Sequence, residues 1–221
     1  MNVTVGSWKT GITALGIGIG VLISTEASVI RAGCSIRGAD LLPSFAGRLI
    51  YALDNDWKFI REDIRDAESP DFDDTDWEEI DLPHTWNGID TFDDDPGYYR
   101  GAGWYRKTFT LEEGFRHRKI FLEVLAASTV TDVWVNKHHI GRFKGGYTGF
   151  FVDITPAVLF GSARNLLAIK AVNSYRPDIP PGRKIPDYNI YGGVCGRVRL
   201  VITDPTYIAP RHYFVTPQRV S

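Results

Sequence analysis

Residues 101–155 constrain the fold of this 221-residue chain most strongly, because they contain a dense series of short strand-like segments. Apolar side chains recur at every second position in Lys119–Leu125 and Thr131–Asn136, and Trp104–Leu111 alternates in a similar way. This period of two is typical of a half-buried β-strand. Asn136-Lys137 indicates a tight turn, since asparagine tolerates the positive φ that such a turn requires. The stretch therefore predicts consecutive antiparallel strands.

The rest of the chain continues this pattern. Further apolar segments follow, separated by loops rich in glycine and proline: Tyr147–Ile154, Asn165–Asn173 and Val194–Thr203. No stretch sustains a helical period over twelve residues. The 13% aromatic content, with 22 Gly and 12 Pro, favours an all-β domain with many turns over a helical bundle. The predicted fold class is therefore all-β, a jelly-roll β-sandwich.

Charge and ligand-forming residues exclude several classes of function. The net charge is −2 and the two signs are interspersed, which argues against nucleic acid or an anionic membrane and favours a neutral ligand. The adjacent His138 and His139 would point to opposite faces of a strand, so they do not suggest a metal site. The acidic run 71–76 lacks the glycine and glutamate of a calcium-binding loop, since Asp76 and Leu82 stand at those positions. No metal or other cofactor is predicted.

Residues 1–47 are predicted to precede the folded domain, as a leader or a disordered segment. Thr10–Thr25 contains no charged residue, Lys9 precedes it, and small residues such as Ala27 follow, as in a secretory signal. The apolar run Ile12–Ile23 is too short for a confident membrane span. A genuine leader predicts a periplasmic or extracellular protein, and its absence predicts a cytoplasmic one.

Six segments connect the chain to a known family. They are NDWKF (55–59), DFDDTDWEEIDLPHTWN (71–87), GAGWYRKTF (101–109), VWVNKHHIGRFKGGYTGFFVDIT (133–155), NLLAIKAVN (165–173) and YGGVCGRVRL (191–200). In this order they resemble the N-terminal sugar-binding domain of family 2 glycoside hydrolases, in its β-galactosidase-like form. The resemblance implies a jelly roll of the galactose-binding-domain type over residues 48–205. It also implies that residues 206–221 are the truncated start of an immunoglobulin-like domain.

The resemblance further implies how catalysis is divided between domains. Family 2 enzymes hydrolyse O-glycosidic bonds with two glutamates, carried on a TIM barrel that follows the immunoglobulin-like domain. We expect that barrel to be absent from this chain, so the chain alone should be inactive. Its expected partners are the missing C-terminal domains and, within the full enzyme, a β-galactoside. The carboxylates of Asp71–Asp76 and Asp93–Asp95 lie in hydrophilic loops and are not expected to replace the glutamates. No catalytic residue is predicted.

Asp187, in the segment IPDYNIYGGVCGRV, is the first substrate-binding candidate. In the β-galactosidases that the chain resembles, an aspartate shortly before this glycine segment reaches the galactose subsite. A carboxylate can accept hydrogen bonds from two adjacent sugar hydroxyls. The sequence departs from the family pattern at Cys195 and Gly196, where relatives usually have an aromatic residue and arginine. Asn173 and Arg176 follow a strand end on the same approach and are further candidates.

The tryptophans divide into core residues and one candidate for sugar stacking. Each buries roughly 150–250 Å² when packed, so a domain of this size needs most of them in its core. Trp104 and Trp134 lie within strand patterns and are predicted to be core. Trp86 lies in a loop beside His84 and Asn87, and is the predicted exception that contacts substrate.

Two other functions remain open on the sequence. A free-standing carbohydrate-binding module of the lectin kind would share the fold but would never have had a barrel. A non-catalytic structural remnant would share the fold without binding sugar. The segment 206–221 favours the enzyme domain, because a complete module has no reason to begin a strand of another domain.

Overall fold

The computed structural model describes residues 34–35, 41–42, 47–90, 92, 97–180, 182 and 189–207. The chain divides into two units, Met1–Arg31 and Ala32–Ser221, and every described residue belongs to the second. Most of the predicted leader and residues 208–221 of the predicted further domain thus lie outside the described residues. Within the described ranges, no helix is long and apolar enough to cross a membrane.

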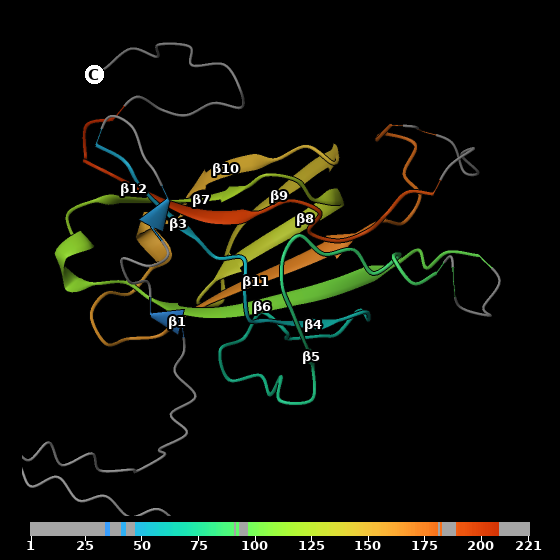
Figure 1. Ribbon diagram of the computed structural model, residues 1–221, viewed down its shortest axis with the longest axis horizontal. Coiled ribbons are helices and arrows are strands. Elements are labelled where there is room, and N and C mark those ends of the chain that lie inside the picture. Colours follow the sequence, from blue (N-terminus) through green and yellow to red (C-terminus); the bar gives the residue numbers. More distant parts are fainter. Residues whose placement is uncertain are drawn as a thin grey trace, which may run out of the picture. The chain divides into compact units, whose positions relative to one another are not determined.

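The described part of the second unit is a sandwich of two sheets (Figure 1). The seven-stranded sheet has the order β5 (Glu78–Ile80), β4 (Trp57–Ile60), β6 (Ala102–Thr110), β11 (Asn165–Val172), β8 (Ser128–Val135) and β9 (His138–Gly146), with β1 (Cys34–Ser35) parallel to β6. The five-stranded sheet has the order β10 (Phe150–Asp153), β7 (Lys119–Val124), β12 (Val198–Thr203), β3 (Leu49–Ala52) and β2 (Leu41–Leu42). Two short 3-10 turns, η2 (Glu113–Phe115) and η3 (Thr155–Ala157), lie in the connections.

One continuous core packs between the two sheets. Its fully buried side chains come from both sheets and include Trp57, Tyr105 and Ile169 from the first and Leu122 and Leu200 from the second. Burying a large apolar side chain of this kind contributes roughly 1.5–3 kcal/mol. The strands and the core confirm the predicted all-β sandwich.

The predicted turn between β8 and β9 is confirmed. Asn136 and Lys137 both lie in the left-handed region, with φ of +50° and +72°. The side chain of Asn136 also donates to the carbonyl of Ala157 and accepts from the amide of Leu166, each at 2.8 Å. The asparagine therefore fixes this hairpin to the neighbouring strand β11.

The structure contains edge strands that the sequence pattern does not predict. β9 and β5 lie at the two edges of the first sheet, and most of their side chains are exposed or half-buried. An edge strand with little burial shows weak alternation of apolar and polar residues, so periodicity does not reveal it. β1 and β2 also lie before Arg48, the predicted start of the folded domain.

The acidic run 71–76 is part of a segment that covers the outer face of the first sheet. Phe72 and Trp77 pack there against Trp104, which confirms their predicted packing onto the sandwich. The guanidinium of Arg106 holds the segment in place. It lies 2.6 Å from the carboxylate of Asp74 and donates to backbone carbonyls of the same segment, those of Ala67, Ser69 and Phe72.

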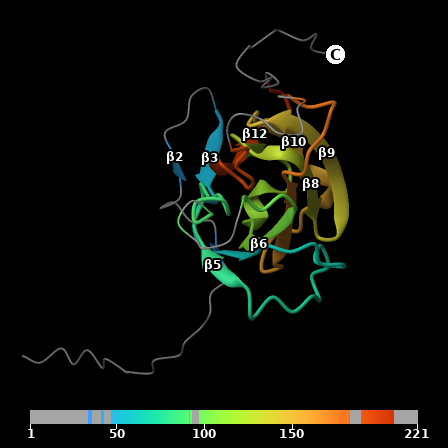
Figure 2. The ribbon, with the colours of Figure 1, turned by 90° about the vertical axis from the view of Figure 1, so that its right-hand side faces the viewer.

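The long loops gather at one end of the sandwich. The antiparallel registers pair Val172 with Ala102 and with Val130, and Ser128 with Gly146, so β6 and β8 begin where β11 and β9 end. The described residues of the loops 81–90, 97–101, 173–180 and 189–197 meet at this end, on the right-hand side of Figure 1. Figure 2 views the sandwich from that side. Three of the predicted substrate-binding residues, Trp86, Asn173 and Arg176, are described and belong to these loops.

Candidate functional site

A network of buried polar side chains and backbone groups joins the long loops. It consists of Asn87, Asp90, Tyr99, Asn173 and Gly192, and we call it the loop network. Its members belong to four described stretches, residues 84–90, 97–101, 173–180 and 189–193. The last two stretches are distant in sequence from the first two. Buried polar groups of this kind are costly unless they are hydrogen-bonded, so the network specifies how the loops meet.

Asn173, a predicted site residue, is the centre of the loop network. It lies at the end of β11 with 1% of its surface exposed. Its Nδ2 donates to the Oδ1 of Asn87 and to the carbonyl oxygens of Tyr99 and Ile190, each at 3.1 Å. Its Oδ1 accepts from the amide of Gly101 at 2.9 Å. In this structure Asn173 positions the surrounding loops, and its side chain is not presented to solvent.

Asn87 and Asp90 extend the network on the other side. The Nδ2 of Asn87 donates to the Oδ2 of Asp90 at 2.5 Å, and its Oδ1 accepts from the amide of Gly192 at 2.6 Å. Asp90 also accepts from the amide of Tyr99 at 2.9 Å and pairs with Arg61 at 3.0 Å. Sequence reasoning missed both residues as site-forming groups. The short spacing of amide and carboxylate in WNGID was the available signal.

Trp86 is buried in the core, and its predicted contact with sugar stays a prediction. Only 3% of its surface is exposed, and its indole stacks on Phe59 with ring centroids 6.2 Å apart. It also packs edge-on against Tyr99. The indole packs against two members of the loop network, Tyr99 and the backbone at Gly192.

Gly192 and Gly193 have a steric role at this junction. A Cβ on Gly192 would lie 2.0 Å from the ring of Trp86 and 2.7 Å from the Nδ2 of Asn173. Gly193 has a φ of +126°, and a Cβ there would lie 2.6 Å from the carbonyl oxygen of His84. Side chains at these positions would push the returning chain away from the network. The glycine pair therefore allows residues 189–194 to approach the other loops closely.

His84 connects the loops to the core. Its Nδ1 lies 2.9 Å from the hydroxyl of Tyr105, and its ring packs on Phe59. Burial lowers the pKa of the His84 imidazole, and the negative charge of Glu78 opposes this shift only in part. The neutral ring is therefore favoured in the folded protein.

Arg176 lies on the surface of the same approach loop. Its guanidinium forms a two-point contact with Asp178, at 2.9 and 3.0 Å, and Lys144 contacts the same carboxylate at 3.1 Å. These hydrogen bonds, that of Arg176 first, hold the pKa of Asp178 well below its usual range. Arg176 thus follows Asn173 in the chain but does not join the loop network. Its predicted contact with substrate stays a prediction.

Asp187 lies outside the described residues. The described residues on either side of its segment are held in place. The amide of Gly182 donates to the carbonyl of Ile179 at 2.9 Å, while Ile190 and Gly192 are bonded to Asn173 and Asn87. The substrate-binding role of Asp187 also stays a prediction.

Comparison with known proteins places these loops in a family. Residues 84–202 match the family described as "Glycosyl hydrolases family 2, sugar binding domain". The matched range contains the loop network and most of the strands of both sheets. It also contains Asp187, Asn173, Arg176 and Trp86.

Named relatives include both kinds of enzyme. A β-galactosidase of Thermoanaerobacter pseudethanolicus is 34% identical over 169 residues, which are 76% of this chain and 23% of that protein. A β-glucuronidase of Bacteroides fragilis is 37% identical over 134 residues, 61% of this chain and 19% of that protein. The crystal structure of a Bacteroides uniformis β-glucuronidase has a TM-score of 0.65 at 35% identity, covering 71% of this chain and 18% of the other.

The chain thus spans less than a quarter of the length of these relatives. The family match covers more than half of the chain, and the sandwich has solved counterparts among family 2 enzymes. The predicted resemblance to the N-terminal domain of these enzymes is confirmed. The chain belongs to glycoside hydrolase family 2, of which it contains the sugar-binding domain.

Proposed function

We propose that this domain forms part of the substrate subsite of a family 2 β-glycosidase, with Asp187 as its direct contact to the sugar. The observation that carries the proposal is the loop network. Asn87 and Asn173 hold the chain at Ile190 and Gly192, so the segment containing Asp187 returns to a fixed point. A contact that is positioned in advance costs less ordering entropy when substrate binds.

The chemistry of a carboxylate suits this role. An ionised aspartate accepts hydrogen bonds only, and two adjacent hydroxyls of a pyranose can donate to its two oxygens. Hydrogen bonds to a charged group contribute roughly 1.5–3 kcal/mol each. The neighbouring Asp178 is engaged with Arg176 and Lys144, so it is a poorer acceptor for a sugar.

We place bond cleavage itself in another domain of the same enzyme. Retaining hydrolysis requires two carboxyl groups about 5–5.5 Å apart, one acting as nucleophile and one as acid. This chain covers 23% or less of the relatives cited, so most of each relative lies outside the region they share. That additional length supports a separate catalytic domain. In this proposal the sandwich contributes to substrate affinity and orientation, and the two glutamates lie on the barrel.

The substrate we propose is a β-galactoside. The long approach to Asp187, rich in proline and glycine, and the β-galactosidase of Thermoanaerobacter pseudethanolicus support it. The β-glucuronidases among the relatives make a β-glucuronide the alternative substrate. A glucuronide carries a carboxylate, which would require a cationic partner in the subsite. Parallel assays with p-nitrophenyl β-galactoside and p-nitrophenyl β-glucuronide on the intact enzyme separate the two.

The test of the subsite is Asp187→Ala in the intact enzyme. Loss of charge-assisted hydrogen bonds worth about 3 kcal/mol should lower kcat/KM about 100-fold, without changing the thermal unfolding midpoint. Asp178→Ala is the matched control, because it removes a carboxylate from the same loop that is already paired with Arg176. It should leave kcat/KM within about twofold. Near-normal turnover in the Asp187 variant would remove this residue from the site.

A further inference from the structure

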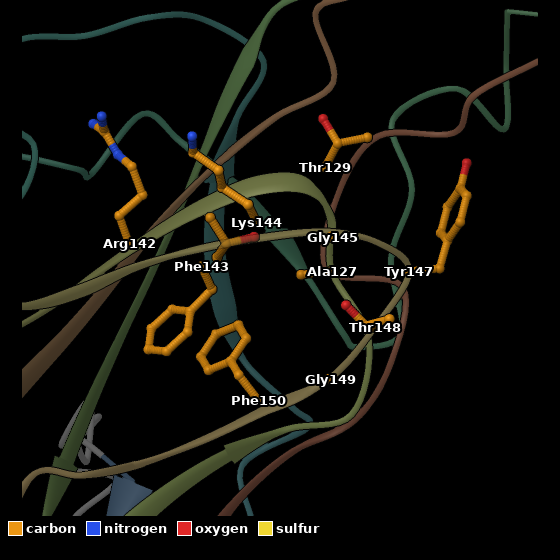
Figure 3. Close-up of a pocket in the computed structure, with 11 residues that line it drawn as sticks. Ala127, Thr129, Arg142, Phe143, Lys144, Gly145, Tyr147, Thr148, Gly149 and Phe150 are labelled. Carbon is orange, nitrogen blue, oxygen red and sulfur yellow. The ribbon is translucent and has the colours of Figure 1, made fainter. Parts of the chain in front are cut away.

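A cleft opens between the two sheets at the loop end of the sandwich. Its volume is about 590 Å³, and its walls include Ala127, Thr129, Thr131, Phe143, Thr148 and Phe150. Figure 3 shows these walls, formed by β8, β9, β10 and the turn between the last two strands. No wall residue belongs to the segments 84–101 or 173–192. The cleft is therefore distinct from the loop network.

The cleft exists because threonine replaces valine at the inward positions of β8 nearest the loop end. Along β8, Val133 and Val135 fill the core, but Thr129 and Thr131 occupy the preceding inward positions. Opposite these threonines on β9 stand Gly145 and Phe143. Small and hydroxyl-bearing residues leave the space between the sheets unfilled, although Thr131 is only 2% exposed. Such an unfilled interior is unusual, because sandwich cores are otherwise close-packed.

Two aromatic rings form the inner limit of the cleft. Phe143 of edge strand β9 stacks on Phe150 of edge strand β10, with ring centroids 3.8 Å apart and planes 2° apart. This pair joins the edges of the two sheets. In Figure 3 both rings lie on one side of β9, and the side chains of Arg142 and Lys144 lie on the other. The cleft thus combines an apolar wall with the exposed hydroxyl of Thr148.

The charged groups at the rim are already paired. The Nε of Arg142 lies 2.8 Å from the carboxylate of Asp132, and the Nζ of Lys144 lies 3.1 Å from that of Asp178. A cation that already has a carboxylate partner exerts little attraction on an anionic ligand. The cleft therefore favours a neutral ligand that has both hydroxyl groups and apolar faces.

We propose that this cleft is a second carbohydrate site, which binds a neutral β-linked disaccharide independently of Asp187. A pyranose ring offers a C–H face to the half-buried Phe143 and hydroxyls to the exposed Thr148. Thr129 already donates its hydroxyl to the carbonyl of Val172, and Thr131 lines the depth of the cleft with 2% of its surface exposed. The volume of 590 Å³ lies within the range of about 300–1,000 Å³ that small-molecule sites occupy. A site of this kind would hold a sugar chain near the enzyme without taking part in bond cleavage.

The experiment is a titration of the isotopically labelled 221-residue chain with lactose, followed by amide chemical shifts. Saturable shifts should occur at the amides of Thr131, Gly145 and Gly149. The dissociation constant should lie in the millimolar range, which corresponds to a binding free energy of about 4 kcal/mol or less. Sodium glucuronate should bind at least about fivefold more weakly. Asp187→Ala should leave the lactose shifts unchanged, which separates this site from the proposed subsite.

Three variants locate the sugar. Thr148→Trp places a large ring over the cleft from an exposed position and should weaken lactose binding at least tenfold. Thr148→Val removes the exposed hydroxyl and should weaken it about threefold to tenfold. Thr108→Val is the matched control, because Thr108 is exposed on β6 away from the cleft. Absence of saturable shifts at these amides, or equal affinity in the Thr148→Trp variant, would overturn the proposal.

Discussion

Asn173 and Asn87 are 86 positions apart in the sequence, yet the Nδ2 of Asn173 donates to the Oδ1 of Asn87 at 3.1 Å. Through this bond the end of β11 is fixed to the loop that follows β5. Both side chains are buried, so water cannot replace the bond if either amide is lost. The loop network should therefore be sensitive to changes that preserve shape but alter donors and acceptors.

Asn173→Asp should destabilise the domain by about 3 kcal/mol or more. The substitution keeps the shape of the side chain but replaces a donor amide, which faces three oxygen atoms at 3.1 Å, with a carboxylate oxygen. Urea unfolding of both proteins measures the difference. The same replacement at the exposed Asn55 should change stability by less than about 0.5 kcal/mol. Equal stabilities of the two variants would contradict the role assigned to Asn173.

Gly192→Ala should cost about 2 kcal/mol or more. The added methyl group would lie 2.0 Å from the ring of Trp86, which is held by the core and cannot move freely. Gly114→Ala is the control, since nothing lies within 4 Å of the corresponding Cβ. Thermal unfolding of the two variants compares the effects. A Gly192 variant as stable as the Gly114 variant would show that the loop tolerates displacement.

Arg106→Lys should release the segment that covers the outer face of the first sheet. The guanidinium is 3% exposed and reaches Asp74 and three backbone carbonyls, whereas an ammonium group cannot reach all of them at once. We expect a loss of about 2 kcal/mol and faster cleavage by protease within residues 65–76. Arg116→Lys alters an exposed pair with Glu113 and should change neither measurement. Unchanged proteolysis in the Arg106 variant would indicate that apolar packing alone holds the segment.

Stability should fall as the pH falls from about 7 to about 5, in part because of His84. Its pKa is lowered by burial, so the unfolded chain binds a proton at this residue more readily than the folded protein. The stability that the neutral His84 contributes is fully present above the ordinary histidine pKa of about 6.5. It is lost as the pH falls toward the pKa of His84 in the folded protein. His84→Gln should flatten the plot of unfolding free energy against pH in this range. An unchanged slope would assign the pH dependence to other groups.

The sequence predicts the sandwich well because its central strands have a clear period of two. β6, β7 and β11 are buried on at least one face, and their apolar residues alternate or run continuously. β9 is harder to predict, since its edge position leaves charged and glycine residues in HHIGRFKGG with little burial. Its amide and carbonyl groups still complete a hairpin with β8.

The candidate site is less predictable than the fold, for a different physical reason. Asn173 was identifiable by its place after a strand, but its buried environment depends on Tyr99, Ile190 and Asn87, which only the folded chain brings together. Trp86 shows the same limit. A loop tryptophan can be exposed or buried. Trp86 is buried here because its indole packs on Phe59 and because Gly192 has no side chain to occupy the same space.

The separation of the network residues also affects how the protein is made. The amide of Gly192 bonds to a residue 105 positions earlier, so a nascent chain cannot complete the loop network until Gly192 has left the ribosome. A contact between residues so far apart in the sequence requires closing a long loop, and this entropic cost must be met before the bond forms. A partly synthesised domain can therefore pair β8 with β9, but it cannot yet join the loops at residues 84–90 and 189–193.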